Sequence, residues 1–196
     1  MEKRSGVFST SRRLARCRRG VAALEFALTA PVALLAVCGV IDMSMVMFVS
    51  TLAEGGLREA SRLGITGYAP AGVSRQDRIL QVLSEHTIGL IDMSTATVAF
   101  RVYRGFEDIG KPEPYVDANG NGTYDAGESF NDVNGNGVWD ADMGTAGVGG
   151  PGDVVVYTMT YDWTVLTPLV ATVFGNNGAI QMSASVAVRN EPWTTP

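Results

Sequence analysis

The clearest chemical pattern in the sequence is an acidic stretch that repeats itself. Residues 112–144 contain seven acidic side chains and no basic one. Within them, DANGNGTYDAGE begins at Asp117, and DVNGNGVWDADM begins 15 residues later at Asp132. Both copies place Asp and Asn side chains two residues apart around a glycine, which is the spacing of a calcium-binding loop. Because seven like charges repel one another, a divalent cation would stabilise the stretch, and we predict Ca²⁺ as its cofactor.

The first copy predicts a complete ligand set for calcium, an ion that takes about six to eight oxygen ligands. Gly122 falls at the position that requires a sharp turn. Acidic, amide and carbonyl oxygens stand at the ligand positions on either side of it. The expected ligands are Asp117, Asn119, Asn121, the carbonyl of Thr123, Asp125 and, at the twelfth position, Glu128.

The second copy is less complete at its end. Its expected ligands are Asp132, Asn134, Asn136, the carbonyl of Val138 and Asp140. Met143 occupies the twelfth position and Asp142 comes one residue early, so this loop binds more weakly or shares carboxylates with the first. The flanks do not resemble the helices of an EF-hand, and the loops are more similar to those of dockerins or thrombospondins. A solvated turn rich in Asn and Gly, joining two strands, is the alternative.

A second candidate site lies where a basic segment meets an apolar one. The first 20 residues carry seven bases and one acid, which leaves eight bases and nineteen acids, a formal charge of −11, in the rest. From Val21 to Ile41 the one charged residue is Glu25. A helix of that length spans about 31 Å, close to the hydrocarbon thickness of about 30 Å. We predict a single-pass membrane helix with its N-terminus in the cytoplasm, because basic residues stay inside, and with the body outside.

Other function classes fit less well. The apolar run is longer than that of a cleaved secretory signal, and Val37 stands before Cys38 where a lipoprotein would have a small residue. The acidic body does not suit a nucleic-acid partner. No nucleophile and base are recognisable as a pair, so we expect neither an enzyme nor a small-molecule substrate.

The residues around this junction carry a family resemblance. Gly20 followed by Glu25 and Phe26, between arginines and an apolar run, resembles a class IV prepilin processing site. Three segments resemble the TadE-like family, the minor pilins or pseudopilins of tight-adherence, Flp-type pilus systems. These are RRGVAALEFALTAPVALLAVCGVIDMSM at 18–45, LREASRLGITG at 57–67 and VRNEP at 188–192.

The resemblance implies a protein of the bacterial inner membrane, with its body in the periplasm or outside the cell. A prepilin peptidase would cut after Gly20 and free the amine of Val21. Glu25 would then pair with such an amine on another pilin or pseudopilin subunit, since an unpaired buried carboxylate is costly. Alternatively, Glu25 reaches the cytoplasmic interface or pairs with Arg18 or Arg19. A separate alternative is an unprocessed single-pass membrane protein whose calcium-binding domain binds a partner or surface ligand.

The elements that position these sites follow from periodicity. Helical spacing continues past the membrane to about residue 66, and a second helix is predicted over 74–90 from Ser74. Period-two alternation predicts strands near 95–104, 153–166 and 179–189, with a short helix from Pro168 between the last two. The expected fold is α+β, a long N-terminal membrane helix running into a pilin-like body whose small antiparallel sheet packs on helices. The expected divisions are a basic leader (1–20), the assembly helix (21–67) and an exported body (68–196) with its calcium-loop insertion (112–144).

Overall fold

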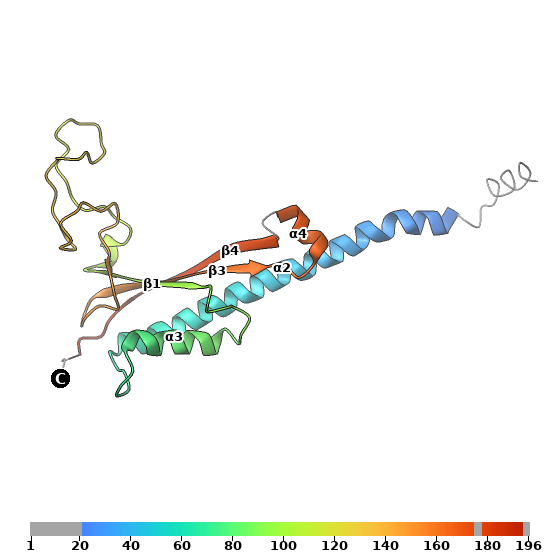
Figure 1. Ribbon diagram of the computed structural model, residues 1–196, viewed down its shortest axis with the longest axis horizontal. Helices are drawn as coiled ribbons and strands as arrows, with labels where there is room; N and C mark the ends of the chain where they lie inside the picture. The colour runs from blue at the N-terminus through green and yellow to red at the C-terminus, as the bar shows by residue number, and fades with distance from the viewer. Residues whose placement is uncertain (1–20, 175–177, 194–196) are drawn as a thin grey trace, which may run out of the picture.

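The computed structural model describes residues 21–174 and 178–193, and its longest element is helix α2, Val21–Ile65. At 1.5 Å per residue its 45 residues measure about 68 Å. Its first half extends alone from the molecule, and its second half lies along the body (Figure 1). The helix confirms the prediction that the apolar segment continues unbroken into the body.

The two halves of α2 have different surroundings. The apolar residues before Asp42 are largely exposed, as Leu24 at 64% and Phe26 at 71% illustrate. After Asp42 the buried positions recur at helical spacing, which defines one face turned to the body. These positions are Val49, Ala53, Gly56, Leu57, Ala60, Ser61 and Gly64. One helix therefore carries both a bare apolar surface and a core-forming face.

The body contains a four-stranded antiparallel sheet in the order β2-β1-β3-β4. The strands are β1 Thr97–Tyr103, β2 Thr145–Ala146, β3 Val154–Thr164 and β4 Ala179–Arg189. The predicted α+β class, with a small antiparallel sheet packed on helices, is confirmed. Strand β2 was not expected, because two residues are too short to show a period-two pattern.

The core lies between this sheet and α2. Alternation along β3 buries Val155, Tyr157 and Met159 completely, and the Tyr157 ring meets Phe100 of β1 edge to face at 5.4 Å. Tyr157 reaches α2 at Gly64, where a Cβ would overlap the tyrosine hydroxyl. The glycine therefore allows the helix and the sheet to approach closely.

Helix α3, Arg75–His86, packs against the second half of α2. Ser74 caps it by accepting the N–H of Asp77 at 3.0 Å, as the sequence predicts. The helix ends at His86 and not near residue 90, because the chain turns at Ile88, whose φ is +47°. Gly56 of α2 makes room for α3, since a Cβ there would lie 3.0 Å from Leu83.

The C-terminal VRNEP segment ties these elements together. The buried Asn190 donates from its amide to the carbonyls of Val148 and Gly150, at 3.1 and 2.9 Å. The N–H of Glu191 donates to the carbonyl of Ile65, the last residue of α2, at 2.9 Å. The segment thus joins the end of the long helix to the loop that precedes β3.

Candidate functional site

The acidic repeat lies in the long connection between β1 and β2. Within this connection the short 3-10 helix η2, Phe106–Asp108, comes first, and the two loops follow. Figure 1 places the loops beyond the end of the sheet, away from the start of α2. We call residues 117–128 the first loop and residues 132–140 the second loop.

Each loop is wound around its first aspartate. Asp117 accepts three backbone N–H groups from residues 120–122, at 2.7 to 3.2 Å. Asp132 accepts the same three from residues 135–137, at 2.6 to 3.1 Å. The N–H of Gly122 is the main reason that the pKa of the Asp117 carboxyl lies below its ordinary value. Each aspartate side chain is thereby held at the centre of a turn.

The asparagines converge on the second aspartate of each loop. In the first loop, the amides of Asn119 and Asn121 both donate to Oδ2 of Asp125, at 2.6 and 2.7 Å. Asn121 Oδ1 in turn accepts the N–H of Thr123 at 2.8 Å. The second loop repeats these bonds, from Asn134 and Asn136 to Asp140, each at 2.6 Å, and from the N–H of Val138 to Asn136 at 2.7 Å. In each loop, two asparagines are thereby joined to one aspartate oxygen.

Glu128 closes the first loop. Its two carboxylate oxygens accept the N–H of Ala118 at 2.8 Å and the N–H of Asp125 at 3.0 Å. These residues stand at the second and ninth positions, so the glutamate joins the two ends of the loop. The sequence places Glu128 at the twelfth position, and in the structure its carboxylate contacts the backbone of the loop.

The second loop is closed by Glu113, a residue that the ligand spacing does not single out. Its oxygens accept the N–H groups of Val133 at 2.7 Å, Asn134 at 3.2 Å and Asp140 at 3.2 Å. Val133 and Asp140 are again the second and ninth positions. Glu113 is fully buried and lies 15 residues before Glu128, which is the period of the repeat. The repeat thus extends back to Glu113, and that extension is the sequence signal that could have found it.

Four aromatic side chains hold the loops against each other. Tyr124 and Trp139, at the eighth position of each loop, stack with centroids 4.5 Å apart and planes 13° from parallel. Tyr115 meets both rings edge to face, and Phe130 meets Tyr124 in the same way. The indole of Trp139 also donates to the carbonyl of Glu113 at 2.9 Å. The loops therefore form one packed pair.

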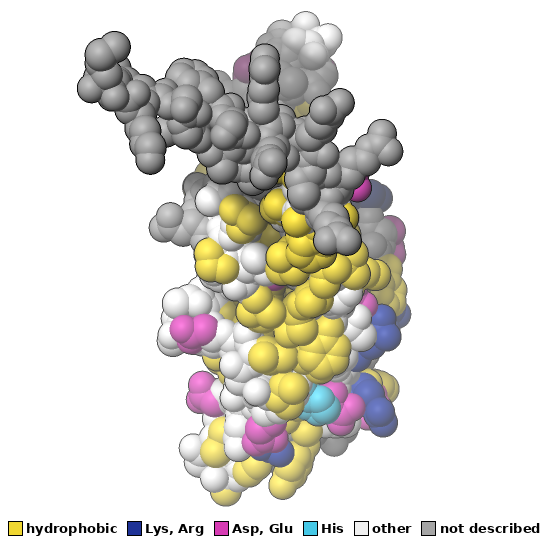
Figure 2. Space-filling model, turned by 90° about the vertical axis from the view of Figure 1, so that its right-hand side faces the viewer, with side chains coloured by type: hydrophobic (Ala, Val, Ile, Leu, Met, Phe, Trp, Pro, Cys, Tyr) yellow, Lys and Arg dark blue, Asp and Glu magenta, His cyan; other side chains and the backbone are white. Residues whose placement is uncertain are grey.

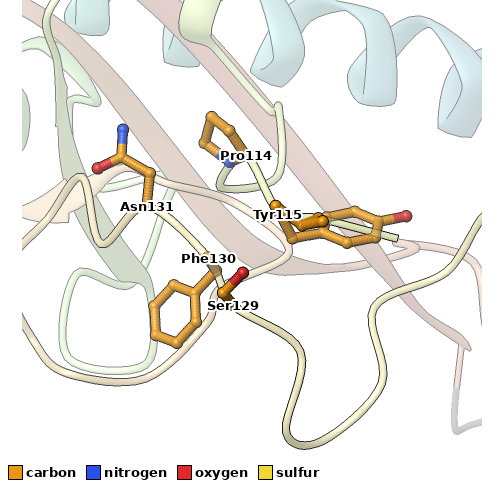
Figure 3. A pocket seen from close by; sticks show the side chains of 6 residues that line it. Pro114, Tyr115, Ser129, Phe130 and Asn131 are labelled. Atoms are coloured by element: carbon orange, nitrogen blue, oxygen red, sulfur yellow. The ribbon is translucent and has the colours of Figure 1, made fainter. Parts of the chain in front are cut away.

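The segments that lead into the loops pair with each other as well. Tyr115 and Phe130 form an antiparallel bridge, and the adjacent bonds run from the N–H of Val116 to Ser129 and from that of Asn131 to Pro114, at 2.9 and 2.8 Å. Figure 3 shows these two segments around a surface hollow. Equivalent residues of the two copies face each other across the bridge, as a two-fold arrangement requires.

Asp142 lies beside the second loop but is held by β1. Its carboxylate accepts the hydroxyl of Tyr103 at 2.9 Å and lies 3.2 Å from the guanidinium of Arg101. Burial, followed by this hydrogen bond, raises the pKa of Tyr103. Asp142 lines one hollow with Asn134 and Asp140, yet the bonds that close the loop come from Glu113.

The acidic side chains alone do not form a metal cluster. Within residues 21–174 and 178–193, no three Asp, Glu, His or Cys side chains gather closely enough to hold an ion. A calcium site here would depend on amide and carbonyl oxygens beside the carboxylates, which calcium accepts. The oxygen-rich donor set fits calcium, provided that the asparagine amides turn their oxygens toward the ion.

The second candidate site is the start of α2. Gly20, the expected cleavage position, lies outside the described residues. Val21, Glu25 and Phe26 lie in the first two turns of the helix, and all three side chains are exposed. Of the part of the chain that the structure describes, α2 alone is long and apolar enough to cross a membrane, with a mean hydropathy of 2.4 over its best window.

The comparison with protein families bears on this helix. Residues 20–62 match the family model described as TadE-like protein. The TadE-like segment begins at Gly20 and includes Glu25, Phe26 and most of α2, whereas the sheet and the two loops lie outside it. The match supports a relation to TadE-like proteins, association with a pilus system, and anchoring by a single membrane helix. No curated protein and no solved structure matches the chain.

Proposed function

We propose that the chain is a TadE-like minor pilin, or pseudopilin, that a prepilin peptidase cleaves after Gly20 at the inner membrane. The observation that carries this proposal is the bare apolar half of α2, which begins one residue after Gly20 within the matched segment. A helix with that surface needs lipid or neighbouring helices around it. A pilin-type subunit uses the same helix first in the membrane and then in an assembly.

Glu25 is the residue that this proposal assigns to assembly. Its side chain is exposed on the second turn of α2, close to the end that cleavage would create at Val21. A carboxylate in an apolar assembly requires a cation, and the new amine of a neighbouring subunit would supply it. Glu25 would therefore act after cleavage and would be dispensable for the cut itself.

The test of cleavage is the mature N-terminus of the protein purified from native membranes. Mass spectrometry is expected to find a chain that begins at Val21, and a Gly20→Leu variant is expected to retain its first 20 residues. Gly6→Leu is the matched control, because it changes another glycine of the same segment and should be cleaved normally. An intact N-terminus in the unaltered protein would contradict the proposal and favour an unprocessed single-pass protein that binds a partner through its exported body.

A Glu25→Gln variant separates cleavage from assembly. We expect it to be cut after Gly20 like the unaltered chain but to lose co-purification with other pilin subunits, because an amide cannot compensate an amine. Normal co-purification of the cleaved variant would leave Glu25 without the proposed role.

We also infer that the paired loops bind Ca²⁺ and thereby stiffen the exported body. The supporting observation is the duplicated convergence of Asp, Asn and Glu side chains, each loop having the same bonds. Asp117, Asn119, Asn121, the Thr123 carbonyl, Asp125 and Glu128 would hold one ion. Asp132, Asn134, Asn136, the Val138 carbonyl, Asp140 and Glu113 would hold the other.

Hydrogen exchange of the full chain in detergent micelles tests this inference. Ca²⁺ is expected to slow exchange of the backbone N–H groups within residues 117–142, whereas the same concentration of Mg²⁺ should act less because it dehydrates reluctantly and demands octahedral geometry. The N–H groups of β3 serve as an internal control that should not respond. Unchanged exchange in the loops with calcium would contradict calcium binding and leave a solvated turn.

A further inference from the structure

The short helix α4, Pro168–Phe174, and the residues before it form a small apolar lobe beside α2. We call residues 165–172 the α4 lobe. Two of its side chains face inward, since Val165 is 6% and Val170 is 9% exposed. Leu166 and Leu169 point outward and are 57% and 58% exposed. Packing of the lobe therefore leaves two leucines on its outer surface.

A hydrogen bond fixes the position of this lobe along α2. The N–H of Leu166 donates to Oδ1 of Asp42 at 2.8 Å. Asp42 lies 21 residues after Val21, which is about 32 Å along the helix axis, close to the hydrocarbon thickness of about 30 Å. If the apolar half of α2 spans a membrane, the α4 lobe lies at the far edge of that membrane. Figure 1 shows α4 at the end of the sheet nearest to the start of α2.

The chain around the lobe carries little charge, and the exposed Asp162 of β3, three residues before the lobe, is its nearest charged residue in sequence. Residues 163–188 contain no Asp, Glu, Lys or Arg, and between Phe26 and Ala53 the one charged residue of α2 is Asp42. Asp42 is 3% exposed and turned to the lobe, so its side chain is kept from the surface. Figure 2, which views the molecule from the end where α2 begins, shows hydrophobic side chains gathered along the middle of the face.

We infer that the α4 lobe is a second membrane contact, whose leucines enter the boundary between lipid headgroups and acyl chains. The inference goes beyond processing and assembly and rests on the insertion of α2 into a membrane. Lipid is favoured over a second copy of the chain because the exposed leucines lie beside the end of the bare apolar surface of α2, where Val40 and Ile41, the two residues before Asp42, are 67% and 52% exposed. Two contacts would hold the body at a fixed tilt to the membrane.

Site-directed spin labelling of the full chain in lipid bilayers tests this inference. Cys17 and Cys38 are replaced by serine, and single cysteines are introduced as Leu169→Cys, Val37→Cys and Val138→Cys. Val37 lies within the apolar half of α2 and Val138 in the second loop, and both are exposed, at 57% and 63%. Access of each label to oxygen, which partitions into lipid, is compared with access to a water-soluble nickel chelate.

We expect the label at 169 to resemble the label at 37, with high oxygen access and loss of access to the chelate. A label at 169 that resembles the label at 138 would overturn the inference. Shielding at 169 with spin–spin broadening that vanishes on dilution with unlabelled chain would also overturn it and assign the surface to a second copy. Water-like behaviour at 37 would overturn the insertion of α2 as well. Leu166→Cys repeats the measurement at the second leucine and keeps the backbone N–H bonded to Asp42.

Discussion

The two loops share one set of hydrogen bonds but are closed in different ways. The first loop is closed by Glu128, which lies three residues after Asp125 and is half-buried. The second is closed by Glu113, which comes from before the first loop and is fully buried. The first loop thus depends on its own residues, whereas the second depends on the chain that precedes both. We learn that the two loops form a pair in space, in which the second loop is completed by a glutamate that precedes the first.

The difference in closure is tested most strongly by the same substitution, glutamate to glutamine, made separately at Glu113 and at Glu128. Glu113→Gln replaces an acceptor oxygen with an NH₂ group in a buried site where three N–H groups converge. We expect the local stability of the second loop to fall by about 3 kcal/mol, because buried donors lose a charged acceptor. Hydrogen exchange at Val133 and Asp140 measures this loss.

Glu128→Gln is the matched control for that variant. Its site is partly open to water, which replaces the lost acceptor, so we expect a loss of about 1 kcal/mol confined to the first loop. Exchange at Ala118 and Asp125 measures it. Equal losses in the two variants would contradict the difference in closure that the structure describes.

The aromatic stack offers a smaller test of how the loops depend on each other. Trp139→Phe keeps a ring against Tyr124 but removes the indole N–H that donates to Glu113. We expect a loss of about 1.5 kcal/mol, because the carbonyl of the buried Glu113 loses its donor and the smaller ring packs less well. Urea denaturation followed by near-ultraviolet circular dichroism measures this change in the full chain. Tyr124→Phe retains the stacked ring and should be nearly neutral; an equal effect of both variants would argue against a special role of the Trp139 hydrogen bond.

The smallest expected effect concerns acid. Hydrogen bonds from the backbone, that of Gly122 first, hold the pKa of Asp117 below its ordinary 3.8. Because the folded pKa is the lower one, the carboxylate stabilises the first loop above pH 3.8, and this contribution is lost as the pH falls through the lowered value. Carbon-13 NMR of the labelled Asp117 carboxyl should show a midpoint below 3.8. A midpoint at or above that value would indicate that the bonds are not formed in solution.

Most of the scaffold could be predicted from the sequence because its signals are local. Helical spacing of apolar residues predicts α2 both in its exposed first half and along the body. Alternation of apolar and polar residues predicts that Tyr157 of β3 faces the core. The apolar spacing predicts α3 to about residue 90, which is wrong, because the spacing continues through Ile88 while the backbone already turns there. The two-residue strand β2 gives no local signal and arises from its pairing with β1.

The ligands of the first loop are predictable from the sequence, whereas the residue that closes the second loop is not. Ligand spacing alone identifies the residues of the first loop, since its Glu128 follows at the twelfth position. It could not identify Glu113, because closure of the second loop by an upstream residue is a tertiary contact. In the second loop the twelfth position is occupied by Met143, and Asp142 is the adjacent acidic residue. Its carboxylate is instead held by Tyr103 and Arg101 of β1. The contact between Asp42 and Leu166 joins residues 124 positions apart and is equally invisible to local patterns.

The central claim about the loops is that they bind two calcium ions as a pair, with Glu113 and Glu128 completing one site each. Isothermal titration of the full chain in detergent, with Ca²⁺ raised to about 1 mM or above, tests it most directly. We expect two ions per chain, with Glu113→Gln and Glu128→Gln each losing one. Two ions retained by Glu113→Gln would contradict the assignment of Glu113, and no heat from the unaltered chain would contradict calcium binding altogether.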